Sequence, residues 1–192
     1  MTMLIAGIVI FLGIHSISIV AAPTRDALVT KLGLGPWKGL YSIISLVGFA
    51  LICMGYGNAR LDPLVLYQPP GWARHITMLL MLPVFVLFLA ANLPGKIKSV
   101  VRDPLLMATK TWALAHLIAN GTAADAILFG GFLLWAVVDL ISVKQRRARE
   151  VPALPPVRAN DMIAVVGGLG IYTLFVFWAH GALIGIPLFI SS

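Results

Sequence analysis

The chain has 192 residues, of which 60% are hydrophobic and 11% charged, and its net charge is +7. Soluble domains carry about 25% charged residues, so this composition excludes an ordinary soluble protein and predicts an all-α integral membrane protein. We expect the basic residues to lie in loops and to set the membrane topology. Binding to nucleic acid is therefore not expected.

Six apolar runs follow one another along the chain, separated by turn signals such as Pro69-Pro70-Gly71, Pro94-Gly95 and Asn120-Gly121. A helix crosses the hydrocarbon with about 20 apolar residues, so the sequence predicts a bundle of about six transmembrane helices. Residues 1–192 are expected to form a single transmembrane domain. The expected spans are about Met3–Ala22, Leu40–Tyr56, His75–Leu93, Pro104–Asn120, Ala123–Val143 and Met162–Phe189.

The first run resembles a signal peptide in length, but it lacks a basic segment before it and is interpreted as a retained helix. Twelve of the basic residues fall in or beside the loops after the first, third and fifth runs, and two after the second run. The positive-inside rule places the first group of loops in the cytoplasm. With six spans, both termini are then expected on the opposite side.

Four histidines occur in or beside these runs, and the topology assigns each an approximate depth. His15 and His116 lie deep in the first and fourth spans, whereas His75 and His180 lie towards the outer side. Ionisable residues inside a membrane are costly and usually face the bundle interior. A haem iron takes axial nitrogens from separate elements, so the deep pair predicts a haem site. A zinc site needs further ligands, and the sequence places none at that depth.

The neighbours of His116 add detail to this prediction. Trp112 and Asn120 stand four residues before and after it, on the same helix face. Trp112 is expected to stack on a flat ligand, and Asn120 to bond to a backbone group at the helix end. Lys110 and Arg102 are candidates to reach a haem propionate. The alternatives are an interfacial tryptophan, a turn asparagine and two basic topology anchors.

Two other features are interpreted as packing. Cys53 is the single cysteine and lies in an apolar run, so it forms no intramolecular disulfide and no cysteine-based metal cluster. The segment VVGGLG (Val165–Gly170) is expected to permit close helix packing rather than to bind a dinucleotide. No Ser-His-Asp set or phosphate-binding loop is present, so hydrolysis and phosphoryl transfer have no support.

Three segments carry a family resemblance: FLGIHS (Phe11–Ser16), WALAHLIANG (Trp112–Gly121) and FLLWAVVDLISVKQRR (Phe132–Arg147). With them the chain resembles, over nearly its whole length, the NnrU family of bacterial membrane proteins. That family also covers the plant 15-cis-zeta-carotene isomerase. The resemblance implies haem b, with its iron ligated by His15 and His116. It also implies a multi-pass protein of the bacterial inner membrane, whose termini are then periplasmic.

The resemblance leaves the activity open between three classes. The first is an accessory or sensor protein in nitrite and nitric oxide metabolism, linked to denitrification. The second is a haem-dependent cis–trans isomerase of a polyene or another lipid-soluble molecule. The family commonly has Arg-His-Pro where this chain has Asp103 as the middle residue, and the isomerase branch has a cysteine where this chain has Ala113. The second departure, Ala113, argues against a close copy of the isomerase. The third class is a structural protein without cofactor, whose histidines bond across helices.

Overall fold

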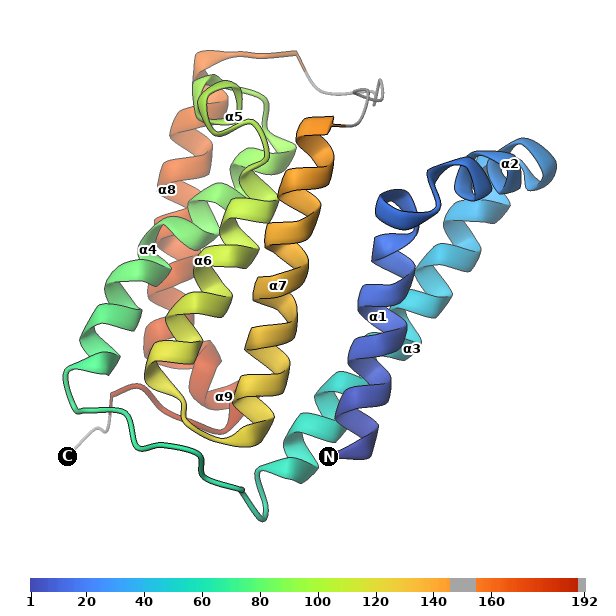
Figure 1. The fold of residues 1–192 in the computed structure, drawn as a ribbon. Coiled ribbons are helices and arrows are strands. Elements are labelled where there is room, and N and C mark those ends of the chain that lie inside the picture. Colours follow the sequence, from blue (N-terminus) through green and yellow to red (C-terminus); the bar gives the residue numbers. More distant parts are fainter. Residues whose placement is uncertain (146–154, 190–192) are drawn as a thin grey trace. The chain divides into compact units, whose positions relative to one another are not determined.

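The computed structural model describes residues 1–145 and 155–189 and is almost entirely helical (Figure 1). The helical share is 82%, and the described residues contain no strand, only an isolated bridge between Val65 and Thr122. Five helices are long and apolar enough to cross a membrane. The prediction of an all-α, multi-pass membrane protein is confirmed.

The helices follow the expected spans, with two additions. In chain order they are α1 (Thr2–Val20), α2 (Ala22–Leu32), α3 (Leu34–Ala59), α4 (Ala73–Asn92), α5 (Lys96–Val101), α6 (Pro104–Ala119), α7 (Ala123–Gln145), α8 (Arg158–Leu174), a π-helical segment (Phe175–Ala179) and α9 (His180–Ile184). The five long helices are α1, α3, α4, α7 and the continuous segment Ala159–Ile184. The fourth expected span forms α6, whose 16 residues reach about 24 Å at the usual rise per residue.

The helices α2 and α5 replace segments that the sequence predicted as loops. Both are short and mix apolar with charged residues, so hydrophobic periodicity gives no clear signal for them. Pro23 lies in the first turn of α2, where its missing N–H costs nothing. Pro36 likewise lies in the first turn of α3, which begins at Leu34, so its missing N–H breaks no helical hydrogen bond. The last helix ends at Ile184, earlier than expected, because Gly185 adopts a left-handed conformation that stops it.

The chain divides into two compact units, which we describe one at a time. The first unit comprises Met1–Pro70 and Ala119–Arg146, and the second comprises Gly71–Ile118 and Arg147–Ser192. The expectation of one transmembrane domain over the whole chain stays a prediction.

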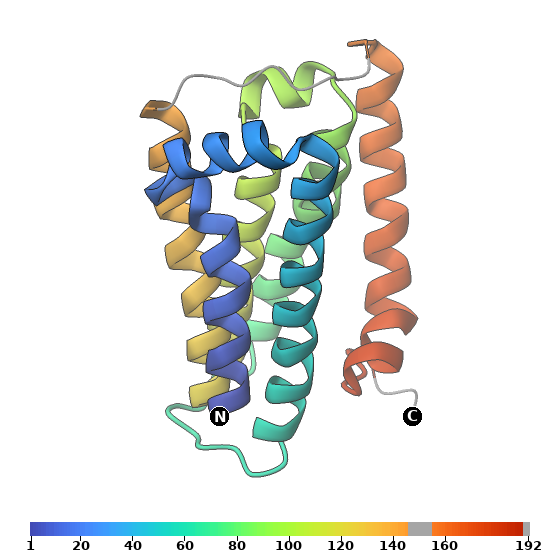
Figure 2. The ribbon, with the colours of Figure 1, turned by 90° about the vertical axis from the view of Figure 1, so that its right-hand side faces the viewer.

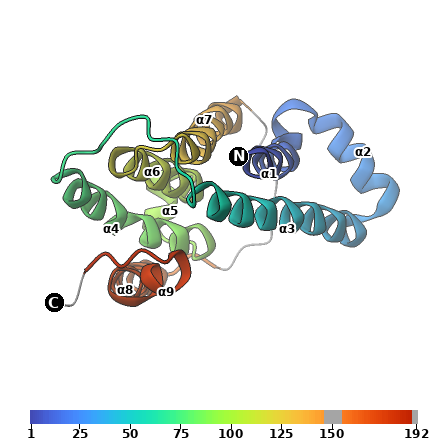
Figure 3. The same cartoon turned by 90° about the horizontal axis from the view of Figure 1, so that it is seen from below.

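In the first unit α1 and α3 run antiparallel at very short range, with α7 packed against them (Figures 2 and 3). Three glycines permit this approach. A Cβ on Gly7 would lie 2.6 Å from the backbone nitrogen of Ile52, and one on Gly48 would lie 2.7 Å from that of Phe11. Gly55 has the same relation to Leu4. Small residues at such positions let helix backbones pack closely in a membrane.

In the second unit α4 packs against α8, and again a glycine sets the distance (Figure 3). A Cβ on Gly168 would lie 2.6 Å from the backbone nitrogen of Val86, so VVGGLG serves close packing as predicted. The Tyr172 hydroxyl donates a hydrogen bond of 3.0 Å to the Met78 carbonyl across the same pair of helices. On its other side, α4 contacts α6 through Thr77, whose hydroxyl donates to the Ala115 carbonyl over 2.7 Å.

The start of α8 also holds the short helix α5. Both oxygens of the Asp161 carboxylate accept backbone N–H groups at the α5 N-terminus, from Lys96 over 2.8 Å and from Ile97 over 2.9 Å. Gly95 precedes them, and any Cβ there would collide with the Asp161 carboxylate. The amide nitrogen of Asn160 donates to the Pro94 carbonyl over 2.7 Å. Asn160 and Asp161 therefore fix the α4–α5 loop.

Candidate functional site

His15 lies on α1 and is tied to its own helix. Its Nδ1 atom is 2.7 Å from the carbonyl oxygen of Phe11, one turn earlier. A carbonyl can only accept, so Nδ1 carries the proton in this hydrogen bond. In the neutral imidazole the lone pair then sits on Nε2, the ring nitrogen that this hydrogen bond leaves available.

Three aromatic rings surround the half-buried His15 imidazole. Phe11 stacks on it with 4.2 Å between ring centroids, Tyr41 of α3 lies at 5.2 Å, and Trp135 of α7 meets it edge-on at 6.1 Å. We call these four residues the His15 cluster. Each of the three membrane-spanning helices of the first unit therefore contributes to the surroundings of one histidine.

The His15 cluster contains a buried polar atom without a partner. Within the part of the chain that the structure describes, Nε1 of Trp135 makes no hydrogen bond. A buried donor of this kind costs free energy and usually marks a missing acceptor. Asp139, one turn further along α7, lies near enough to His15 and Tyr41 to act on both electrostatically.

His116 lies near the end of α6 and repeats the backbone contact of His15. Its Nδ1 atom is 2.9 Å from the Trp112 carbonyl oxygen. The Trp112 ring lies 5.4 Å from the imidazole, tilted by 50°. The structure thus brings together the two residues that their spacing placed on one helix face.

The other residues predicted around His116 take different places. Asn120 follows the end of α6 and belongs to the first unit, where its carbonyl accepts a hydrogen bond of 2.7 Å from the Tyr67 hydroxyl. Lys110 is half-buried on α6, six residues before His116. Arg102 is exposed between α5 and α6 and has a positive φ of 65°, which is rare for a residue with a side chain.

The two remaining histidines stand apart from these. His75 is exposed in the first turn of α4. His180 begins α9, and its Nδ1 atom is 2.7 Å from the Ile186 carbonyl oxygen. Among residues 1–145 and 155–189, no three His, Cys, Asp or Glu side chains come together in a way that could hold a metal ion.

The surroundings of each histidine, taken one at a time, suit an axial ligand of a haem iron, which takes two nitrogens rather than a cluster of ligands. Metal-ligating histidines commonly donate their other ring N–H to a carbonyl or carboxylate, as His15 and His116 both do. The rings of the His15 cluster offer apolar contacts from three helices, and Nε1 of Trp135 offers a donor to a carboxylate. His15 belongs to the first unit and His116 to the second.

Sequence reasoning missed Tyr41 and Trp135, although Trp135 carries a usable signal. Tryptophan in a membrane protein usually lies at the interface, where its N–H finds water. Trp135 instead lies near the middle of the 23-residue helix α7. A tryptophan in the middle of a membrane-spanning helix needs a hydrogen-bond acceptor inside the protein, so its position indicates a candidate binding site around it.

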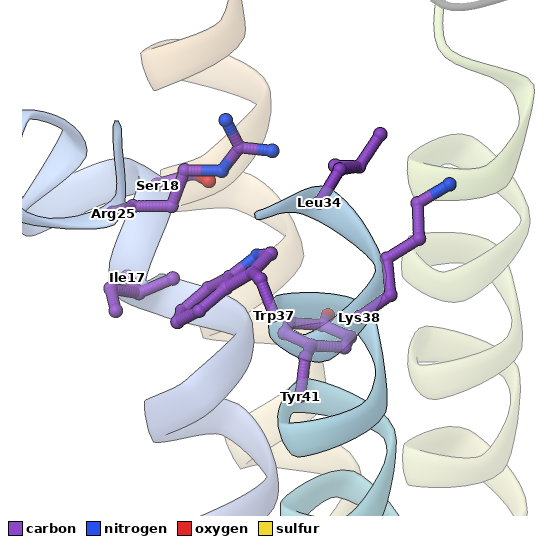
Figure 4. A pocket seen from close by; sticks show the side chains of 7 residues that line it. All are labelled: Ile17, Ser18, Arg25, Leu34, Trp37, Lys38 and Tyr41. Atoms are coloured by element: carbon purple, nitrogen blue, oxygen red, sulfur yellow. The ribbon is translucent and has the colours of Figure 1, made fainter. Parts of the chain in front are cut away.

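A pocket of about 270 Å³ opens beside the His15 cluster, at the end of α1 (Figure 4). Its lining combines two cations with aromatic, hydroxyl and aliphatic side chains. The cations are Arg25 and Lys38, and the other lining residues are Trp37, Tyr41, Ser18, Ile17 and Leu34. Tyr41 is therefore shared between the pocket and the His15 cluster. From the sequence, the two cations were expected to serve topology alone.

Comparisons with known proteins agree with the motifs. No curated protein and no solved structure matches the chain. A family model described as NnrU protein matches residues 3–188. Since this match covers nearly the whole chain, the protein belongs to the NnrU family.

Proposed function

We propose that this NnrU-family protein binds haem b, with His15 and His116 as the axial ligands, and serves as an accessory or sensor in nitrite and nitric oxide metabolism. The single observation that carries the haem proposal is the shared tether: both Nδ1 atoms lie within 3 Å of the carbonyl four residues earlier. This contact fixes the ring orientation and leaves Nε2 as the ligating atom in each.

The side chains around His15 suit such a group. Phe11 and Tyr41 shield the imidazole from water and lipid with apolar ring surface. Trp135 supplies a hydrogen-bond donor where the protein itself provides no acceptor among the described residues. A bound haem would supply redox chemistry and affinity for small diatomic ligands such as nitric oxide, within a range set by its axial ligands.

The test is an absorption spectrum of the detergent-purified protein, oxidised and reduced, beside His15→Gly and His116→Gly. We expect a Soret band with sharp reduced α and β bands, which each substitution abolishes. Added imidazole is expected to restore the band in both variants, because it can occupy the vacated ligand position. The exposed His75→Gly serves as the control and keeps the full spectrum. A colourless protein from haem-replete cells would contradict the proposal and favour the structural alternative without cofactor.

The isomerase alternative differs in the ligands it needs. In the isomerase branch a cysteine three residues before the second histidine would offer a competing ligand, but this chain has Ala113 there, fully buried in α6. We therefore rank the isomerase second. Carbon monoxide added to the reduced protein shows whether an axial position opens. A shifted Soret band agrees with nitric oxide sensing and with polyene isomerisation, which both need an open position, whereas an unchanged band shows that both histidines stay bound and argues against both.

A further inference from the structure

We propose that the pocket at the end of α1 binds the phosphate group of an anionic phospholipid. The first support is the positive charge of the side chains that line the pocket. Arg25 of α2 and Lys38 of α3 both line the pocket, and Ser18 adds a hydroxyl at its wall (Figure 4). Two cations from different helices around one cavity bind an oxyanion with charge-assisted hydrogen bonds.

The size and lining of the pocket favour a lipid headgroup. Its volume of about 270 Å³ is below that of common drug-sized sites, so it admits a headgroup but no acyl chain. Chains must then lie outside, and α3 continues from the pocket with exposed apolar side chains, Leu40 at 45% and Ile43 at 62% exposure. The occupant that fits both surfaces has a phosphate and a long apolar tail.

The place of the pocket in the fold agrees with this occupant. It lies where α1 ends at Val20 and α3 begins at Leu34, at one end of two membrane-spanning helices. Trp37 is 5% exposed in its wall, and tryptophan with basic residues is typical of the headgroup level. Basic pockets between membrane helices at this level are recognised lipid sites.

One carboxylate competes for the same cation. Arg25 forms an ion pair of 2.9 Å with Asp26, whose side chain is 56% exposed. Exposed pairs between neighbouring residues contribute little, so a phosphate with two or three acceptor oxygens displaces this contact. Asp26→Asn is then expected to raise the affinity for the phosphate.

The experiment is native mass spectrometry of the full chain in neutral detergent, titrated with dioleoyl phosphatidylglycerol or with dioleoylglycerol, which has the same chains and no phosphate. We expect the wild type to retain phosphatidylglycerol and not dioleoylglycerol. The double variant Arg25→Gln, Lys38→Gln is expected to lower the affinity about tenfold or more. The matched control is Lys31→Gln, which removes one exposed charge from α2 outside the pocket and leaves binding unchanged.

A second variant tests whether weaker lipid binding in the double variant comes from a loss of structure. Leu34→Glu keeps both cations and places a carboxylate at the exposed edge of the pocket, so it also weakens phosphatidylglycerol. Excess inorganic phosphate distinguishes the source of the ligand: failure to displace the lipid supports a headgroup site, and displacement supports a site for free phosphate with the same chemistry. Equal affinity in the double variant and in Lys31→Gln overturns the proposal. Loss of haem without loss of lipid in the double variant also overturns it, because the cations would then serve haem carboxylates.

Discussion

Tyr56 at the end of α3 donates a hydrogen bond of 2.5 Å to Oδ1 of Asp125 in the first turn of α7, 69 residues away in sequence. The second carboxylate oxygen, Oδ2, accepts the backbone N–H of Thr122 over 2.9 Å and its hydroxyl over 2.6 Å. Asp125 is 4% exposed. One buried carboxylate therefore caps α7 and joins it to α3 within the first unit.

Removing the Tyr56 hydroxyl is expected to weaken this connection. Tyr56→Phe should lower the free energy of unfolding by about 1.5–3 kcal/mol, the usual range for a hydrogen bond to a charged acceptor. Asp125→Ala should cost more, because it also leaves two groups of Thr122 without their acceptor. The measurement is unfolding in mixed micelles of dodecyl maltoside and dodecyl sulfate. Tyr67→Phe is the control, since its hydroxyl donates to a neutral carbonyl at an exposed site, and equal costs would contradict the prediction.

The α1–α3 contact should be intolerant of a single methyl group. Gly48→Ala places a Cβ 2.7 Å from the Phe11 backbone nitrogen, and overpacking of this kind costs about 1–3 kcal/mol. Gly39 lies on the same helix, and a Cβ there would meet nothing within 4 Å. Gly39→Ala should therefore be neutral or stabilise the helix by up to about 1 kcal/mol. The same micelle unfolding assay compares the two, and a Gly48→Ala protein as stable as Gly39→Ala would refute the close contact.

The α4–α5 loop should open when its carboxylate is removed. Asp161→Ala deprives the Lys96 and Ile97 amides of their acceptor, and loss of such a helix cap costs about 0.5–2 kcal/mol. The specific readout is hydrogen exchange, which should accelerate at these two amides. The exposed Asp62→Ala is the control and should leave both rates unchanged. Unaltered exchange in Asp161→Ala would show that the loop is held by other contacts.

The effect of replacing Trp135 should depend on whether haem is bound. In protein from haem-depleted cells, Trp135→Phe removes an unpartnered buried donor, whose burial costs about 1–3 kcal/mol. Stability should therefore stay constant or rise. If haem binds as proposed, the same variant should release it faster. Trp178→Phe, at a side chain that is 64% exposed, is the matched control for both measurements. Strong destabilisation of the haem-depleted variant would contradict the first expectation.

Hydrophobic periodicity predicted the long helices well, because each must present about 20 apolar residues to lipid. Even the end of α6 was predicted within one residue, since Asn120-Gly121 follows it. The pattern could not predict α2 or α5, which are short, mix apolar with charged residues and depend on neighbours for their stability. For α5 the neighbour is Asp161, 65 positions after Lys96. Contacts at this separation depend on tertiary packing that no local signal encodes.

The candidate site, too, could be predicted where local sequence sets the geometry and not where tertiary packing does. The contact of His116 with Trp112 followed from helical spacing. The depths assigned to His15 and His116 stay a prediction, and His116 lies only three residues before the end of α6. The rings of Tyr41 and Trp135 come from other helices. Their approach to His15 depends on which faces of α1, α3 and α7 meet, and Gly7, Gly48 and Gly55 set the contact between α1 and α3. The ligation of haem by the two histidines stays a prediction.

The glycine contacts between α1 and α3 also bear on how the protein is made. Both helices, and all three glycines, lie within residues 2–59, whereas α7 of the same unit begins at Ala123. Chains fold during synthesis from the N-terminal side onwards. The hairpin can therefore close in the membrane while the ribosome is still translating the second unit. His15 and Tyr41 would then be paired early, and Trp135 would complete their surroundings only after α7 has been made.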